Sequence, residues 1–413
     1  MVPAHRGQTS RIAPGDNRSD VLGWTYDMEH VRPGAIRAGR LRLQRCPAAS
    51  NGRLPGKLLG LVVLAALTCT LAVGCGSRPS SASDSLHTSA TSFLSAYVAS
   101  SGAVIRRGQG GDVVSEGQAY GMLIAELAGS ATEVRRIWGW TSAHLLQPDG
   151  LLAYHATAQG VLLSHQSATD ADTLAAYALL RYRGAMAAKL HQAGLRMAAA
   201  IIRKESVRGP GGAFLPTAGP WANGIPTIVD PSYWMPAVYL GLAGYTGNSS
   251  WRKAATDVIR LTGQVTSNGK LLPPDWAELI GSGIRAIPGP SGGAPIQYGL
   301  DAARVPIFMA TSCSAGGRSL ASTWWHRYFR SSAARDRSIA LSTSGGVLNS
   351  NTNPLPYLAA AATAEAAGDH VAAERLMAQA RAEGQRYPTY YGNAWLVLGP
   401  ALLAGRLGAC RPT

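Results

Sequence analysis

Helical patterns follow one another along most of this chain, and their succession constrains its fold more than any other feature. From residue 86 onward, apolar residues recur at intervals of three and four, the spacing that gathers them on one face of a helix. The pattern covers residues 117–127, 173–182, 185–202, 234–242, 251–262, 305–311, 355–367 and 370–383. Segments rich in glycine and proline separate these helices, and no series of alternating strands occurs. The sequence therefore predicts one all-α domain over residues 86–413.

Successive helices joined by long irregular loops are what a helical toroid requires, with an inner ring around the centre and an outer ring covering it. Short strand-like pieces at 151–154 and 227–229 are expected to decorate the loops on one face. Loops held by a rigid scaffold commonly carry function. The loop face is therefore the predicted location of the site.

The N-terminal region predicts export. Residues 58–73 read LLGLVVLAALTCTLAV, without a charge, and follow Arg53 and Lys57. This is the pattern of a signal peptide, at the short end for a membrane-spanning helix. We expect residues 58–75 to be a lipoprotein signal with Cys75 as the lipidated residue, so that the protein resides in the cell envelope. An uncleaved membrane anchor and simple secretion are the alternatives.

Two further segments flank this signal. Residues 1–57 form a basic lead, which is disordered or follows a mis-assigned start, and residues 76–85 form a serine-rich linker. The net charge of +15 comes partly from this lead, and the remaining arginines stand singly. No nucleic-acid-binding motif accompanies them, so nucleic acid is not an expected partner. An anionic envelope surface stays open as a partner.

Cysteines and histidines give little support for a metal site. Beyond Cys75 only Cys313 and Cys410 remain, and an exported protein would allow them to pair, although the sequence does not show that they meet. No CxxC or HExxH spacing occurs, and the histidines do not cluster. No metal or other cofactor is therefore expected.

Three segments place a carboxylate at the start of an apolar helix: SEGQAYGM with Glu116, ATDADTLAAYALL with Asp170, and YGLDAARVP with Asp301. Each has a structural interpretation. Ser115 and Gln118 are spaced as a capping box, and the aspartates of the second segment can cap their helix. In the third, Asp301 and Arg304 can form an ordinary ion pair.

Taken together, the three segments resemble glycoside hydrolase family 8, and the resemblance runs in consistent order from 115 to 398. Shorter supporting pieces are WGWT from Trp138, DGLLA from Asp149, DPSY from Asp230, PDW from Pro274 and YYG from Tyr390. The nearest resemblance is to the small cellulases that accompany bacterial cellulose synthesis. It implies an (α/α)6 barrel and inverting hydrolysis of β-1,4 glycosidic bonds.

The resemblance also implies residue roles. Glu116 would be the general acid, Asp301 the base that activates water, and Asp170 the charge that stabilises the distorted central sugar. An inverting pair needs one protonated and one ionised carboxyl, roughly 6.5 to 9.5 Å apart. A helix N-terminus lowers the pKa of a carboxyl, so desolvation or a neighbour such as Asp170 must raise the pKa of Glu116.

The remaining candidates would bind substrate. Aromatic rings cover the apolar C–H faces of sugars, although many aromatic residues are simply core. We expect Tyr233 and Trp276 to line the cleft. The other predicted substrate-binding residues are Tyr120, Tyr390, Asp172 and Arg304.

The sequence thus predicts a monomeric, exported endoglucanase acting on a neutral β-1,4-glucan. Within the family, chitosan, xylan and mixed-linkage glucan are alternative substrates, and a chitosanase would need more acidic residues around its cleft. A non-catalytic polysaccharide-binding lipoprotein is the main alternative of another class, and loss of the acid or base would mark it. A helical scaffold for protein partners explains the ordered motifs least well.

Overall fold

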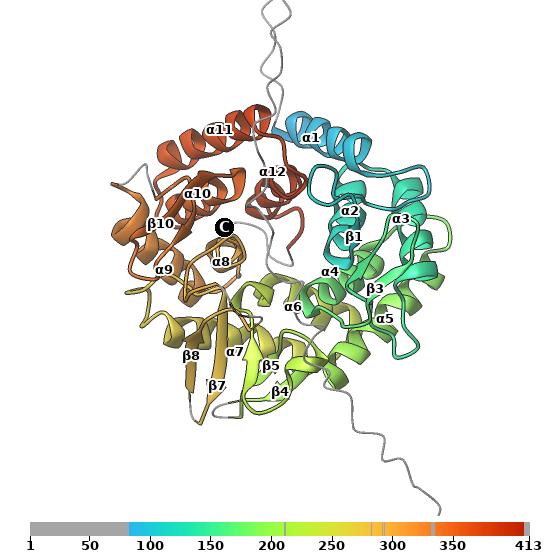
Figure 1. Ribbon diagram of the computed structural model, residues 1–413, viewed down its shortest axis with the longest axis horizontal. Coiled ribbons are helices and arrows are strands. Elements are labelled where there is room, and N and C mark those ends of the chain that lie inside the picture. Colours follow the sequence, from blue (N-terminus) through green and yellow to red (C-terminus); the bar gives the residue numbers. More distant parts are fainter. Residues whose placement is uncertain are drawn as a thin grey trace, which may run out of the picture. The chain divides into compact units, whose positions relative to one another are not determined.

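Twelve α-helices form two concentric rings in the residues that the computed structural model describes, 82–408 without 210–211, 282, 291, 293 and 332–334 (Figure 1). The inner ring consists of α2 (Ser115–Leu127), α4 (Thr169–Arg181), α6 (Pro236–Thr246), α8 (Arg304–Ala310), α10 (Pro354–Ala366) and α12 (Tyr390–Leu403). The outer ring consists of α1 (Ala82–Tyr97), α3 (Ala131–His144), α5 (Ala187–Lys204), α7 (Ser249–Val265), α9 (Ala315–Trp324) and α11 (His370–Arg386). The predicted all-α class and (α/α)6 barrel are confirmed.

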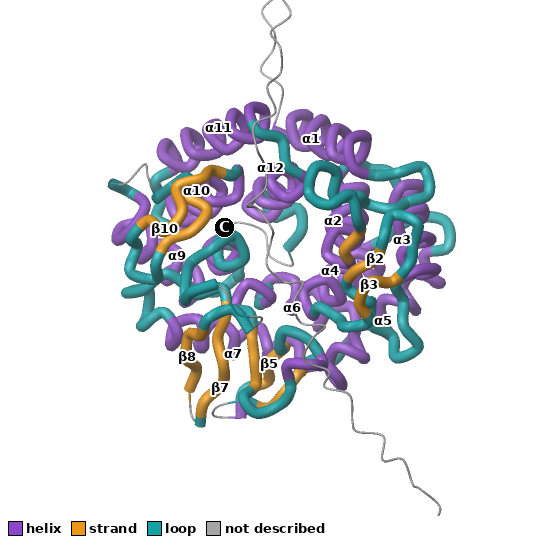
Figure 2. Tube along the Cα trace, viewed as in Figure 1, coloured by secondary structure: helices purple, strands orange, loops and turns teal. Residues whose placement is uncertain are grey.

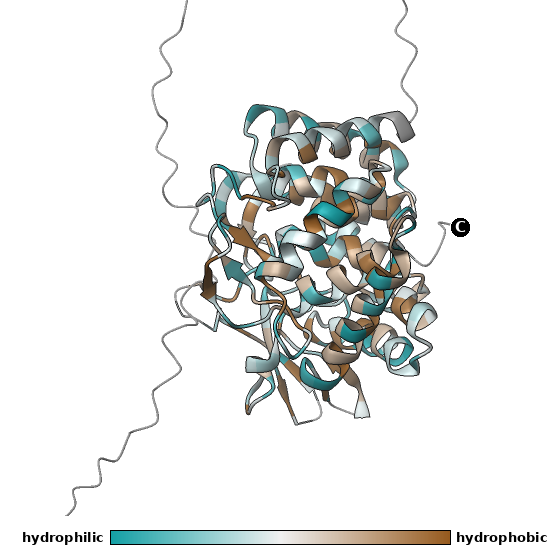
Figure 3. Ribbon diagram, turned by 90° about the vertical axis from the view of Figure 1, so that its right-hand side faces the viewer, coloured by the Kyte–Doolittle hydropathy of each residue, from teal (hydrophilic) through white to brown (hydrophobic). Residues whose placement is uncertain are grey.

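The two rings differ in their sequences because they differ in burial. Inner helix α10 buries Leu358 to Ala364 without interruption, so it is apolar on every side. Outer helix α5 buries only one stripe, which includes Leu190, Met197 and Ile201. The side view in Figure 3 accordingly shows hydrophilic and hydrophobic residues alternating along the helices.

Short antiparallel strands lie in the connections between helices (Figure 2). Two sheets have three strands, β1 (Val113–Val114) with β2 (His155–Ala156) and β3 (Leu162–Ser164), and β6 (Thr227–Val229) with β7 (Trp276–Ile280) and β8 (Gly283–Ile287). Two are hairpins, β4 (Ser206–Arg208) with β5 (Phe214–Pro216), and β9 (Ser338–Leu341) with β10 (Val347–Thr352).

The first and last helices of the barrel lie side by side and close the rings. Asn393 on α12 donates a hydrogen bond from Nδ2 to the hydroxyl of Tyr97 on α1, at 2.9 Å. The ring of Tyr390 also packs against Tyr97 and Phe93, with centroid distances of 5.7 and 6.1 Å. Closure thus joins residues from opposite ends of the domain.

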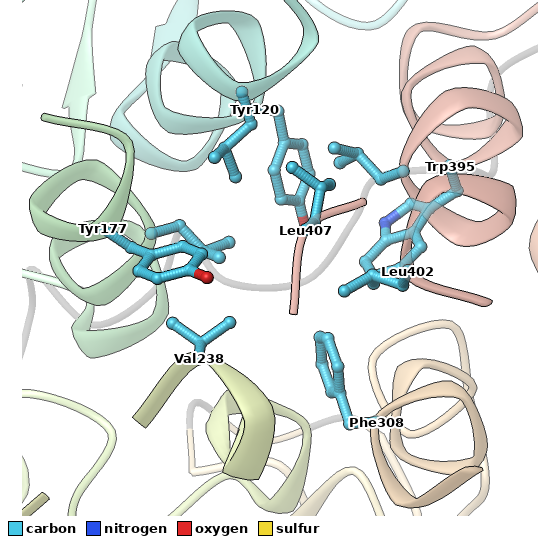
Figure 4. Close-up of a pocket in the computed structure, with 10 residues that line it drawn as sticks. Tyr120, Tyr177, Val238, Phe308, Trp395, Leu402 and Leu407 are labelled. Carbon is cyan, nitrogen blue, oxygen red and sulfur yellow. The ribbon is translucent and has the colours of Figure 1, made fainter. Parts of the chain in front are cut away.

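An apolar cavity of about 20 Å³ lies on the axis of the barrel (Figure 4). Inner helices contribute its walls, with Tyr120, Leu174, Val238, Phe308 and Trp395 among the lining residues. Leu407, which follows α12, also lines it and is 2% exposed. A space of this size without polar walls is expected to stay dry.

Element boundaries differ from the predictions in several places. The predicted strand at 227–229 is confirmed as β6, whereas 151–154 contains only an isolated bridge from Leu152 to Leu146. Helix α1 begins at Ala82, so the predicted linker 76–85 ends earlier than expected, since serine and aspartate are favoured in a first helical turn.

The predicted lead, signal and lipidated Cys75 lie outside the described residues. Within residues 82–408, apart from the gaps above, none of the helices is both long and apolar enough to cross a bilayer.

Candidate functional site

The three predicted catalytic carboxylates meet at one buried guanidinium, that of Arg304. Its Nη1 donates to Glu116 Oε1 at 2.8 Å and to Asp170 Oδ2 at 2.9 Å, and its Nη2 donates to Asp301 Oδ1 at 3.2 Å. Arg304 is 2% exposed and begins α8. The predicted pair of Asp301 and Arg304 is therefore one contact of a larger cluster, which unites three segments distant in sequence.

The start of α2 is held by the sheet that precedes it. Strands β1 and β2 pair directly before Glu116, and the Ser115 N–H donates to the Tyr154 carbonyl at 2.9 Å. Asp112, one residue before β1, accepts from Arg106 Nε at 2.7 Å and lies 2.6 Å from His155 Nε2 on β2. These contacts fix the position from which the Glu116 side chain extends.

The capping box expected at Ser115 and Gln118 does not form. Val114 occupies the N-cap position, and no side chain caps the helix. Gln118 is fully buried instead, where its Oε1 accepts from the Val104 N–H and its Nε2 donates to Thr141 Oγ1. The glutamine therefore links α2 to α3 and to the preceding loop.

Glu116 has the electrostatic environment of an acid catalyst. Its pKa is raised to about 7, chiefly by burial, with Asp170 and Asp301 acting in the same direction. Arg304 and the hydrogen bond from the Tyr120 hydroxyl, 2.7 Å from Oε1, oppose this rise. Desolvation therefore outweighs the nearby cation, so Glu116 can hold a proton near neutral pH.

Asp170 lies in the first turn of α4 without capping it, since Ala168 is the N-cap residue. Its Oδ1 accepts the Ala171 N–H at 2.8 Å, and burial raises its pKa against the influence of Arg304. The pKa of Asp301 is also raised by burial. The Asp301 side chain is 19% exposed, against 4% for Asp170 and 13% for Glu116, so Asp301 is the most accessible to water.

Asp230 also belongs to this cluster, although no role was predicted for it from the sequence. Its Oδ1 accepts from the backbone N–H and the hydroxyl of Ser232, each at 2.7 Å, and its Oδ2 lies 4.0 Å from Arg304 Nη2. The Ser232 hydroxyl in turn accepts from Nη2 at 2.6 Å. The DPSY piece of the family resemblance was the available signal.

Asp172 differs from the prediction that it contacts sugar. It is fully buried, and its Oδ1 accepts the Leu152 N–H at 2.8 Å. Fully buried Glu205 lies beside it, and burial raises the pKa of both carboxyls well above the usual range. These two residues are therefore buried, and the charge of nearby Asp170 contributes to the raised pKa of each.

The aromatic candidates divide into two groups. Tyr233 and Trp276 are 5% and 7% exposed and share a cluster with Trp221, whose ring centroid lies 6.4 Å from that of Trp276. Tyr233 also packs over Arg304 at 5.5 Å. Tyr120 on α2 and Tyr390 on α12, which were also predicted to bind substrate, have no exposed surface.

Cys313 is disulfide-bonded, and Cys410, whose pairing with it the sequence left open, lies outside the described residues. Among the residues that the structure describes, no group of three or more histidine, cysteine, aspartate or glutamate side chains is arranged to hold a metal ion.

The family model for glycosyl hydrolases family 8 matches residues 67–403. The chain belongs to glycosyl hydrolase family 8. A relative described as a probable endoglucanase, from Novacetimonas hansenii, is 29% identical over 227 residues, which cover 52% of this chain and 64% of that protein. Endoglucanase A of Acetivibrio thermocellus is 26% identical over 308 residues, 71% of this chain and 62% of that protein.

This family 8 chain thus spans slightly less than two thirds of the length of these curated relatives. Among solved structures, the endo-β-1,4-glucanase of Acetobacter xylinum superposes with a TM-score of 0.62 at 22% identity. The superposition covers 79% of this chain and 99% of that one. It confirms the barrel fold expected of the family.

Proposed function

We propose that this protein is an endo-acting glycoside hydrolase that cleaves β-1,4-glucan with inversion of configuration. The observation that carries the proposal is the joint attachment of Glu116 and Asp301 to one guanidinium. The two carboxyls accept hydrogen bonds from Arg304 at 2.8 and 3.2 Å, so both can reach a single glycosidic bond. The inverting course is taken from the family resemblance, in which acid and base stand roughly 6.5 to 9.5 Å apart. The family and the names of its relatives support the substrate class.

In the proposed mechanism, Glu116 donates its proton to the glycosidic oxygen as the bond to the anomeric carbon breaks. Its raised pKa keeps that proton available near neutral pH. Asp301, the most exposed of the three carboxyls, accepts a proton from the water that attacks the opposite face of the sugar. The products carry one new hydroxyl each, and Glu116 and Asp301 exchange protons with solvent before the next turnover.

Asp170 and Arg304 would stabilise charge during this step. The oxocarbenium-like transition state is positive, and Asp170 supplies a fixed negative group beside Glu116, to which it is joined through Nη1 of Arg304. Arg304 limits how far burial raises the pKa values of Glu116, Asp170 and Asp301. The mechanism requires Asp301 to be ionised while Glu116 remains protonated.

The expected export and membrane attachment complete the proposal. The uncharged segment 58–73 and Cys75 support a lipoprotein that acts outside the cytoplasm on a polymer too large to enter it. An anchored or freely secreted form would act on the same polymer. The proposed partner is the polysaccharide alone, bound by a monomer.

The test is hydrolysis of carboxymethylcellulose by the full chain, followed by viscosity and by release of reducing ends, beside a Glu116→Gln variant. A rapid fall in viscosity that the variant abolishes supports internal cleavage with Glu116 as the acid. With cello-oligosaccharides, proton NMR should detect the α-anomer of the new reducing end first. Hydrolysis of chitosan or xylan but not of β-1,4-glucan would show that the substrate has been assigned wrongly. Hydrolysis of none of these polymers would favour the alternative of a non-catalytic polysaccharide-binding protein.

A further inference from the structure

Asp301 stands on a tight turn whose backbone is held by a second carboxyl. Within the turn, Ala303 N–H donates to Gly299 O at 3.0 Å and Arg304 N–H donates to Asp301 O at 3.1 Å. Before it, Tyr298 exchanges two backbone hydrogen bonds with Leu341 of β9, at 2.8 and 2.9 Å. The turn is thus attached at both ends, and its centre needs a separate support.

Asp275 provides that support. Its Oδ1 accepts two backbone N–H groups, those of Gly299 and Ala302, each at 2.9 Å. Its Oδ2 accepts from Gln297 Nε2 at 3.0 Å, and its own N–H donates to the Gln297 carbonyl at 2.9 Å. One carboxyl that is 8% exposed therefore brackets Asp301 with a hydrogen bond on either side.

Gly299 lets the Asp275 carboxyl approach the backbone of the turn closely. A Cβ added at Gly299 would lie 2.4 Å from Asp275 Oδ2 and 2.9 Å from Gln297 Nε2, closer than atoms can approach. Glycine is therefore required here for close packing against a carboxyl, and any side chain would displace Asp275 or the turn. The absence of a side chain at Gly299 is thus what allows Asp275 to hydrogen-bond the backbone of the turn.

We propose that Asp275 is a positioning residue for the base, holding the turn so that the Asp301 carboxyl points at the attacking water. The inference rests on the proposed function, because it assigns a task only if Asp301 is the base. Asp275 does not touch the reacting atoms. It acts through the two N–H groups that flank Asp301, and a displacement of about 1 Å at such a group can cost roughly 100-fold in rate.

Asparagine is a close substitute for Asp275 in mildly acidic solution. Burial, together with the charge of Asp301, raises the pKa of Asp275 to about 7, so the side chain is largely neutral at pH 6. An asparagine Oδ1 can accept the same two N–H groups. Its Nδ2 would then face Gln297, whose amide can turn to present oxygen.

The test compares Asp275→Asn and Asp275→Ala at pH 6, with Gln297→Ala as a control that removes only the third contact. We expect the alanine variant to lose about 100-fold in kcat with KM within about threefold, and the asparagine variant to stay within about threefold of wild type. A support that serves stability alone would lower Tm in the alanine variant and leave kcat of the folded enzyme unchanged, which would overturn the proposal. Equal losses in both variants would overturn it too.

Gly299→Ala gives a second route if Asp275→Ala does not fold. Its added methyl group should displace the carboxyl and reproduce the loss of kcat, whereas wild-type kcat in this variant would contradict the inference. An inactive wild-type protein would refute the proposed function itself. An active wild type with an equally active Asp275→Ala variant would refute only the role of Asp275.

Discussion

Glu116 and Arg304 lie 188 positions apart in the sequence, yet Oε1 of the glutamate lies 2.8 Å from Nη1 of the arginine. The same nitrogen also serves Asp170, so two carboxyls share one donor. Burial raises the pKa of Glu116 to about 7 in spite of this cation. Desolvation therefore outweighs the attraction of the guanidinium, and the buried acid can keep its proton near neutral pH.

Activity should fall as the pH rises through about 7, because Glu116 must be protonated to act and its pKa is raised to about 7. Initial rates on a soluble β-glucan between pH 4 and 9 should give kcat/KM with a basic limb near that value. Circular dichroism across the same range separates loss of the proton from unfolding. A rate that stays constant to pH 9 would mean that another group donates the proton.

Glu116→Gln should make the protein more stable at pH 7.5 than wild type. In the unfolded chain the glutamate ionises near 4.5, whereas in the fold its pKa is about 7, so the folded state binds more protons over this interval and stability falls as the pH rises through it. The loss is at most about 3 to 4 kcal/mol, for roughly 2.5 pKa units at about 1.36 kcal/mol each. Thermal unfolding should show Tm above wild type at pH 7.5 and nearly equal at pH 4. The opposite order would contradict the raised pKa.

Arg304→Lys and Arg304→Met should separate charge from geometry. Lysine keeps the positive charge, but its single ammonium group cannot reproduce the planar set of hydrogen bonds that the guanidinium donates to three carboxyls. We therefore expect kcat to fall by about 100-fold in a folded protein. Methionine leaves several buried carboxyls without a cation and should cost about 3 to 5 kcal/mol in the free energy of unfolding. Urea unfolding and steady-state rates measure the two effects. A methionine variant as stable as wild type would show that the carboxyls are already neutral without Arg304.

Leu407→Ala should destabilise the barrel without changing the chemistry. Leu407 is 2% exposed and lines the apolar cavity on the axis, so its removal enlarges that cavity at a cost of about 2 to 5 kcal/mol. Leu195→Ala on α5, where the side chain is 41% exposed, is the matched control and should change stability by less than about 1 kcal/mol. Urea unfolding gives both values, and kcat of the folded variants should equal that of wild type.

Much of the architecture was predictable because the spacing of apolar residues within individual segments is enough to indicate a helix. The segments at 117–127 and 370–383 became α2 and α11 with small changes at their ends. Helices α1, α3, α9 and α12 were not predicted. In two of them the reason is plain, since α3 mixes arginine and tryptophan with its apolar residues and α12 is apolar on nearly every side. The hairpin of β7 and β8 was not predicted either, because its strands are short and their buried and exposed residues alternate only in part.

The candidate site was predictable in its residues but not in its depth. Ordered motifs pointed to Glu116, Asp170 and Asp301, and the structure brings these three to one arginine. Local sequence does not reveal burial, so Asp172 was predicted to contact sugar although its side chain is fully buried. The support that Asp275 gives across 27 positions likewise depends on the fold.

The contact between Asn393 and Tyr97 has a consequence for how the protein is made. These residues are 296 positions apart, so the barrel can close only after α12 has been synthesised. Earlier helices must wait with an open flank until it docks, and contacts of such long range slow folding. The barrel is therefore complete only once α12 has docked against α1, and any change that weakens this contact should slow the closing step of folding.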